Sequence, residues 1–277
     1  MTDLLRVPAD GLARGTRIAL TVVPNAAALT ATFAEALLDE YLAARRAGRA
    51  RVVFIVPVGP VGQYEGLAAL CRANGVSLSD LLLIGMDEYL TAEGDWIAED
   101  DALSFRGHLR RRLLDVMDEQ TVPRVVFPHP RRLDEIPDLI AAHGGVDVCF
   151  GGVGIAGHLA FNEPPEPGEP HDVEAFAALP TRVQALSRET RTINAVTATR
   201  GAIDLIPTHA VTVGMKEVLG ARKLRLFMNR PWQTAILRKL LHGPVTPAVP
   251  ASYAQRHPDP AITVTEEVTH MPGATLA

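Results

Sequence analysis

The chain has 277 residues, a formal net charge of −5 and 47% hydrophobic residues. This length suffices for one large α/β domain or for two small ones. The negative charge argues against a nucleic-acid partner, because proteins that bind the phosphate backbone carry a clustered basic excess. The one basic cluster, Arg110 to Arg112, lies in a helical pattern and is explained by a solvated helix face.

Cysteine usage and hydropathy indicate the compartment. The two cysteines, Cys71 and Cys149, have neither zinc-site spacing nor the density of a disulfide scaffold. Residues 1–10 mix acidic and basic side chains, and no apolar stretch reaches the roughly 18 residues that a membrane span needs. We therefore expect a cytoplasmic protein with no membrane partner.

Short apolar runs alternate with helical patterns along the first half of the chain. Near-continuous apolar strands that alternate with helices predict a mostly parallel sheet covered on both faces. The predicted fold is therefore α/β, doubly wound and Rossmann-like. The expected strands are 17–23, 51–58, 81–86, 124–127 and 146–150, and the expected helices are 26–47, 64–74, 103–117 and 133–143.

The second half begins with a segment rich in Pro, Gly and Glu at 164–180, which predicts an irregular excursion. We expect a lid-like irregular segment around 164–200. No internal repeat or low-complexity linker divides the chain, so we expect a single α/β domain over 1–277. The later expected elements are strands at 210–213, 223–228 and 261–264, a helical turn at 216–219 and a helix at 231–241.

Polar clusters that follow apolar strands are the first candidates for a site, because ligands of open parallel sheets lie beyond the carboxyl ends of strands. Such clusters occur at 57–63, 85–89 and 151–163. In the second, Asp87 and Glu88 follow the run LLLI. A partly buried carboxylate at a strand end can abstract a carbon-bound proton. An ordinary acidic loop is the alternative, and this segment alone favours it.

The third cluster contains a glycine-rich turn that ends in His158. A dinucleotide-binding fingerprint would open a long helix there, whereas here Asn162-Glu163-Pro164 follows. A histidine and a glutamate five residues apart can form a proton-transfer pair, in which Glu163 orients or tunes the imidazole. A structural histidine is the alternative.

Four motifs together resemble those of the glucosamine-6-phosphate deaminase family, which is related to the 6-phosphogluconolactonases. The resemblance runs in colinear order from about residue 15 to residue 268. The NEP ending and the MDEY form are similar to the deaminase branch, whereas the lactonases typically carry a DER-type motif. The four motifs are VPVG at 56–59, MDEY at 86–89, GGVGIAGHLAFNEP at 151–164 and HAVTVGMKEVL at 209–219.

The resemblance implies an enzyme that isomerises an aldose to a ketose and releases ammonia, with no metal or organic cofactor. It implies that Asp87 moves the proton between C2 and C1, and that His158 and Glu163 assist opening of the pyranose ring. The implied partner is a small sugar or sugar phosphate, and a homo-oligomer is left open. The predicted substrate-binding residues are Gly59, Gly62, Gln63, Glu88, Gly152, Gly154, Gly157, Asn162, Arg230 and Trp232.

The sequence departs from the family pattern at several positions. Ala156 stands where the family has an aspartate that helps the ring-opening histidine, and the loss of such a carboxylate commonly costs orders of magnitude in rate. In the turn that holds the phosphate, hydroxyls are missing and Pro60 removes a backbone donor. Val196 and Trp232 occupy positions where the family has cations.

These departures predict an altered substrate and leave several functions open. The first is an isomerase or deaminase acting on a sugar that can be unphosphorylated. The second is the ordinary family activity, with Arg230 or arginines of the lid-like segment, Arg182, Arg188 and Arg191, replacing the missing cations. The third is a non-catalytic sugar-binding or sensing protein, and a lactonase-like hydrolase ranks below these.

Overall fold

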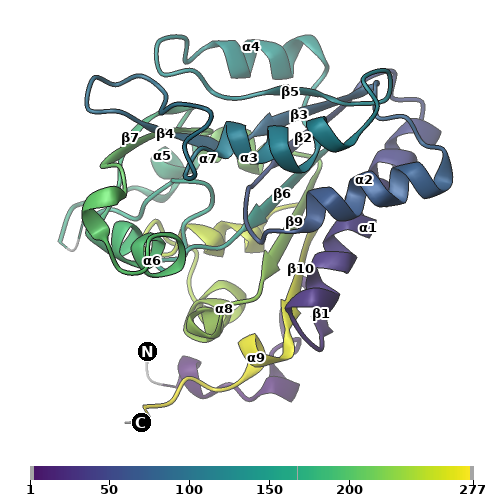
Figure 1. The fold of residues 1–277 in the computed structure, drawn as a ribbon. Helices are drawn as coiled ribbons and strands as arrows, with labels where there is room; N and C mark the ends of the chain where they lie inside the picture. The colour runs from purple at the N-terminus through teal and green to yellow at the C-terminus, as the bar shows by residue number, and fades with distance from the viewer. Residues whose placement is uncertain (1–2, 167, 275–277) are drawn as a thin grey trace.

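The computed structural model describes residues 3–166 and 168–274. Its centre is a seven-stranded sheet in the order β1-β10-β9-β6-β2-β3-β5, and each neighbouring pair of strands is parallel (Figure 1). The predicted mostly parallel α/β fold is thus confirmed. The strands of this sheet are β1 (Ala19–Val23), β2 (Val52–Val56), β3 (Leu81–Gly85), β5 (Arg124–Val126), β6 (Val148–Gly152), β9 (Lys223–Met228) and β10 (Pro260–Thr265).

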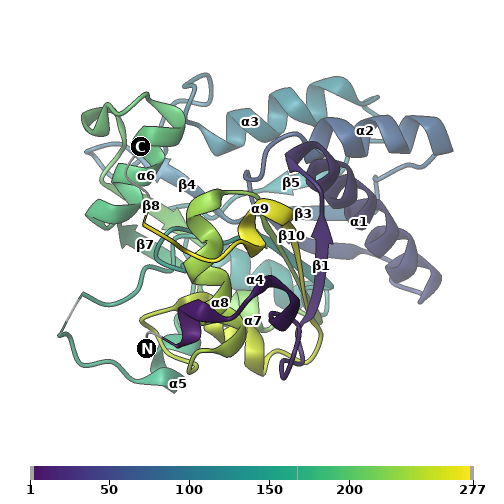
Figure 2. The same cartoon turned by 90° about the horizontal axis from the view of Figure 1, so that it is seen from below.

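Helices cover both faces of the sheet. Figure 2 shows α1, α2 and α3 along one face, and α4, α7 and α8 along the other. Short 3-10 helices flank several of them, so the expected helix at 231–241 begins with a 3-10 turn, Pro231–Gln233. The α-helices are α1 (Ala26–Arg46), α2 (Gln63–Asn74), α3 (Phe105–Arg112), α4 (Glu135–Ala142), α5 (Val173–Ala177), α6 (Arg188–Ala198), α7 (Met215–Leu219), α8 (Thr234–His242) and α9 (Glu266–Thr269).

Each face of the sheet has its own buried core. On the side of α1 and α2, Phe33 stacks on Phe227 with ring centroids 3.9 Å apart and also contacts Phe150. On the other side the core combines aliphatic residues of the central strands with those of α7 and α8. Strands buried on both faces carry apolar residues at successive positions, which is why runs such as VVFIV predicted a covered sheet.

A second, three-stranded antiparallel sheet was not predicted. It consists of β4 (Asp87–Leu90), β8 (His209–Thr212) and β7 (Arg182–Ala185), in the order β4-β8-β7. Met86 alone separates β3 from β4. The MDEY segment was expected at the end of a strand, and Asp87 does follow β3 closely; the chain then enters a second strand, β4, which was not expected.

The segment around 164–200 is more regular than expected. It contains α5, β7 and α6 (Figure 1). Strand β7 forms because it pairs with β8, and α6 begins at Arg188 because Ser187 accepts a hydrogen bond from Thr190 N at 3.2 Å. The expectation of an irregular segment is wrong for residues 182–198, and a lid movement stays a prediction.

Helix α3 is shorter than the expected helix at 103–117. Ser104 caps its first turn by accepting a hydrogen bond from Gly107 N, so the helix begins at Phe105. It ends at Arg112, before a separate 3-10 turn, Leu114–Val116. Across the described stretches of the chain, no helix is both long and apolar enough to cross a membrane.

Candidate active site

A cavity of about 450 Å³ lies where β2, β6 and β9 end. This is the edge at which parallel sheets bind ligands. The lining includes both Asp87 and His158, which are far apart in the sequence. Of the predicted substrate-binding residues, those in the lining are Gly59, Gly152, Gly154, Arg230 and Trp232.

Asp87 faces this cavity from the first position of β4. Its residue surface is 8% exposed, and within residues 3–166 and 168–274 its carboxyl group makes no hydrogen bond or ion pair with another side chain. Burial, and next the charge of Glu88, raise the pKa of Asp87 to about 8. An unpaired carboxyl group with a raised pKa is suited to accept a proton near neutral pH.

His158 and Glu163 form a pair beside the cavity. Nδ1 of His158 lies 3.4 Å from Oε2 of Glu163. The Thr190 hydroxyl donates to the same oxygen at 3.1 Å, and the Ser187 hydroxyl donates at 3.2 Å. Burial alone would raise the pKa of Glu163, but the hydrogen bonds from His158, Thr190 and Ser187 lower it overall. Glu163 is therefore a carboxylate that holds His158 through its Nδ1 atom. The Nε2 atom of the imidazole is left for a ligand.

Two glycines after β6 lie where a side chain would not fit, and one of them makes room for His158. A Cβ atom at Gly154 would lie 1.9 Å from Nε2 of His158, so no other residue fits beneath the ring without displacing it. Gly157 has a φ of +81° and lies against Val249, where a Cβ would be 2.9 Å from Cγ1. Gly154 thus leaves room for the imidazole, and Gly157 allows the chain to pass close to Val249.

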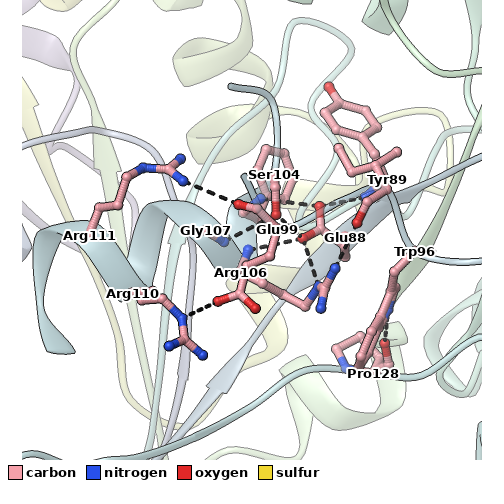
Figure 3. A network of polar contacts seen from close by, with 12 residues as sticks. Glu88, Tyr89, Trp96, Glu99, Ser104, Arg106, Gly107, Arg110, Arg111 and Pro128 are labelled. Atoms are coloured by element: carbon pink, nitrogen blue, oxygen red, sulfur yellow. Dashed lines mark hydrogen bonds and ion pairs between the residues drawn. The ribbon is translucent and has the colours of Figure 1, made fainter. Parts of the chain in front are cut away.

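The structure does not bring five of the predicted binding residues into the cavity lining. Gly62, with φ +107°, and Gln63, whose Nε2 donates to Val58 O at 3.0 Å, shape the turn before α2. Asn162 donates to Leu159 O and Val213 O and accepts from Arg182, which fixes the chain beside His158. Glu88 points toward the first turn of α3 (Figure 3), and both Glu88 and Gly157 lie outside the lining.

The positions that depart from the family pattern have distinct surroundings. Ala156 lies outside the cavity lining, and Val196 is 63% exposed on α6. Trp232 is half-buried and lines the cavity. Among the described residues of the lining, Arg230 is the single Lys or Arg, and it is exposed at the rim.

Several residues of the site were not identified from the sequence. Ser187 and Thr190 belong to a segment that was expected to be irregular. A serine just before a helical pattern is a signal for a helix start, and it was available at Ser187. Asn194, on the same helix, donates to Tyr89 Oη at 2.8 Å, and both residues line the cavity.

Groups of three or more His, Cys, Asp or Glu side chains that could hold a metal ion do not occur in the described residues. The chemistry that these side chains offer is proton transfer by Asp87 and by the pair of His158 and Glu163. A reaction that moves protons between carbon and oxygen atoms of a small polar ligand fits this arrangement.

Comparisons with known proteins find relatives that are glucosamine-6-phosphate deaminases. A glucosamine-6-phosphate deaminase of Lachnoclostridium phytofermentans is 31% identical over 205 residues, which are 72% of this chain and 80% of the relative. The glucosamine-6-phosphate deaminase of Streptomyces coelicolor is 29% identical over 252 residues, 89% of this chain and 90% of the relative. No family model matches the chain.

Solved structures show the same fold. A monomeric glucosamine-6-phosphate deaminase superposes with a TM-score of 0.74 at 22% identity, over 91% of this chain and 98% of the other. The 6-phosphogluconolactonase from Trypanosoma cruzi gives a TM-score of 0.65 at 15% identity, over 91% of this chain and 96% of the other. Because one fold hosts both activities, the fold does not choose between them.

Proposed function

The chain belongs to the glucosamine-6-phosphate deaminase family, and we propose that it isomerises an amino sugar from aldose to ketose with release of ammonia. The observation that carries this proposal is that a candidate base and a candidate acid line the same cavity. Asp87, an unpaired carboxyl group, and His158, an imidazole held by Glu163, both line it. The two steps of the reaction need one group of each kind.

Ring opening is the step assigned to His158. It breaks the bond between C1 and the ring oxygen O5, places a proton from Nε2 on O5 and returns the proton of the C1 hydroxyl to Nε2. The Nε2 atom, beside Gly154 and without a hydrogen bond in the described residues, is the group that delivers the proton to O5. Glu163 stabilises the imidazolium that precedes this transfer.

Isomerisation is the step assigned to Asp87. Its carboxylate takes the proton from C2 of the open chain while the aldehyde oxygen at C1 takes a proton from the imidazolium of His158, which gives an enolamine. Asp87 then returns its proton to C1, and the nitrogen gives a proton back to His158. The resulting imine at C2 adds water and loses ammonia to give the ketose. The ammonium group of a bound amino sugar also favours the carboxylate form of Asp87, because an opposite charge nearby lowers a carboxyl pKa.

We propose further that the substrate carries no phosphate. A phosphate dianion in a cavity needs several charge-assisted contacts to offset its lost hydration. The cavity offers one exposed guanidinium, Arg230, and a wall of apolar side chains. We call Val58, Pro60, Val61 and Trp232 the apolar wall.

We propose an enzyme rather than a non-catalytic sugar-sensing protein. Ala156 lacks the carboxylate that would support His158 in the family, but Ser187 and Thr190 bind Glu163 directly. The pair is therefore held without residue 156. We also propose a cytoplasmic location, which is supported by the two buried cysteines, both free thiols; the homo-oligomer stays a prediction.

The test is ammonia release by the purified protein from glucosamine and from glucosamine 6-phosphate, with Asp87→Asn measured beside the wild type. We expect release from glucosamine with the higher kcat/KM, and a loss of about 1,000-fold in Asp87→Asn because the amide cannot take the C2 proton. Ammonia release that survives Asp87→Asn would exclude Asp87 as the base. Preference for the phosphorylated sugar would exclude the unphosphorylated substrate but not the reaction.

A further inference from the structure

The two carboxylates of the MDEY segment face opposite sides of β4. Successive side chains of a strand alternate between its faces. Asp87 therefore points into the cavity, whereas Glu88 points toward α3 and has no exposed surface. The same strand that presents the base thus carries a second, fully buried carboxylate directly behind it.

Glu88 is saturated with donors (Figure 3). Its Oε1 atom accepts from the backbone N–H of Tyr89 at 2.9 Å and of Phe105 at 3.1 Å. Its Oε2 atom accepts from the Ser104 hydroxyl at 2.8 Å and from Arg106 through its backbone N–H at 2.9 Å and its Nε at 3.2 Å. These donors tie β4 to the first turn of α3, and Ser104 and Phe105 themselves line the cavity.

Arg106, which pairs with Glu88, makes further contacts of its own. Its Nη2 donates to Ile97 O at 2.7 Å, and its guanidinium lies 4.2 Å above the Trp96 ring. Trp96 in turn donates to Pro128 O at 3.0 Å. The ion pair of Glu88 and Arg106 therefore has a fixed position relative to both β4 and the segment after β5.

Asp87 has no such compensation. Besides burial, the charge of Glu88 is what raises the pKa of Asp87. A guanidinium in the cavity, at Arg230, lies at the exposed rim. The ionisable groups around Asp87 are Tyr64 from α2, His108 from α3, Glu88 and Tyr89 from β4, His158 after β6 and Arg230 after β9.

We propose that Glu88 is a positioning residue for Asp87, whose carboxylate places a fixed negative charge behind the base, and that Arg106 holds Glu88 in place. The proposal rests on the proposed function only in giving Asp87 the role of base. A negative charge behind the base makes its carboxylate a stronger proton acceptor, and the bonds to α3 keep the base and the cavity wall in one rigid unit.

The test follows the titration of Asp87 by NMR of protein labelled with ¹³C at the aspartate carboxyl carbons, with Asp87→Asn used to assign the signal. We expect Glu88→Gln to lower the midpoint of this titration by roughly one pH unit, because it removes the neighbouring charge. Arg106→Gln should raise the midpoint, since it leaves the charge of Glu88 uncompensated. Arg106→Lys keeps a positive charge and should leave the midpoint close to that of the wild type.

The matched control is Glu99→Gln. Glu99 pairs with Arg110 in the same cluster of side chains (Figure 3) but does not contact Glu88, so its removal should not move the midpoint. A folded Glu88→Gln with an unchanged midpoint would overturn the proposal. Where Glu88→Gln does not fold, equal midpoints in Arg106→Gln and Arg106→Lys would overturn it, and separated midpoints would support it.

The titration needs no substrate, so this proposal and the proposed function fail in different ways. A shifted midpoint in a protein that releases no ammonia from any sugar would remove the function and keep the coupling. Turnover that depends on Asp87, with a midpoint insensitive to residues 88 and 106, would keep the function and remove the coupling. When both hold, the acid limb of kcat/KM should move with the NMR midpoint.

Discussion

The cavity joins two regions that differ in how their side chains are held. In the catalytic group, which comprises Asp87, His158 and Glu163, hydrogen bonds fix the pair of His158 and Glu163, and Asp87 is buried beside it at the start of β4. The apolar wall has few polar atoms to bind, and its neighbouring cation, Arg230, is exposed. The contrast teaches that the groups for proton transfer and the groups for recognising the rest of the ligand are built separately, so one can change while the other is kept.

After Asp87→Asn, the largest loss of turnover in the catalytic group is expected from Glu163→Gln. The amide keeps the shape of the side chain but cannot hold His158, Thr190 and Ser187 together as donors, so the imidazole loses its orientation and its stabilised charge. We expect kcat to fall by about 100-fold with KM nearly unchanged. Steady-state ammonia release, with folding checked by circular dichroism, measures it.

Thr190→Val is the companion variant. It removes one of the bonds to Glu163 and leaves the carboxylate, so its loss of kcat should be smaller than that of Glu163→Gln. A Glu163→Gln protein with kcat close to that of the wild type would remove the pair from the mechanism, and the catalytic group would then reduce to Asp87.

A smaller effect is expected at the apolar wall, from Trp232→Lys. The lysine places a cation at a half-buried position of the cavity, where a charge-assisted contact to a phosphate is strongest. We expect the ratio of kcat/KM for glucosamine 6-phosphate to that for glucosamine to rise by about 10-fold. Parallel assays of both sugars give the ratio.

Two controls sharpen this result. Trp232→Phe keeps an aromatic surface without a charge and should leave the ratio near that of the wild type. Arg230→Gln should also leave it nearly unchanged when the substrate carries no phosphate. If the wild type prefers the phosphorylated sugar and Arg230→Gln abolishes the preference, Arg230 is a phosphate ligand and the contrast between the two regions is smaller than proposed.

The sequence predicted the main sheet because its strands can be recognised from local patterns. Runs such as VVFIV need only to be apolar and short, and Asn25 and Gly75 mark the ends of helices in a way that does not depend on distant residues. The small antiparallel sheet depends on pairing between β4 and β8, more than 100 residues apart, and no local pattern carries that information.

The site residues that belong to local motifs were predicted, and those that depend on long-range packing were not. Asp87 and His158 were found because they follow strands and belong to motifs, and both line the cavity. Glu88 was expected to bind substrate because it is adjacent to Asp87 in the sequence. The strand β4, which turns these two side chains to opposite faces, was not predicted. Thr190 was missed because its contact with Glu163 depends on where α6 packs.

The last effect concerns stability, not turnover, and comes from Asp87→Asn. Asp87 has a pKa of about 8 in the folded protein and about 4 in an unfolded chain. Between these values the folded state retains a proton that the unfolded state has lost, so the free energy of unfolding of the wild type falls as pH rises from about 4 to about 8. The Asp87→Asn variant has no carboxyl group to ionise at this position and escapes this loss.

We therefore expect Asp87→Asn to match the wild type in stability near pH 4 and to exceed it at pH 8 by several kcal/mol, since each pKa unit corresponds to about 1.4 kcal/mol. Urea unfolding across this pH range measures the difference. Asp10→Asn, at an exposed pair with Arg14, is the control and should show no such trend. If the stability difference between Asp87→Asn and the wild type does not change with pH, Asp87 ionises as readily in the folded protein as in the unfolded chain. The catalytic group would then lack the base with a raised pKa that sets it apart from the apolar wall.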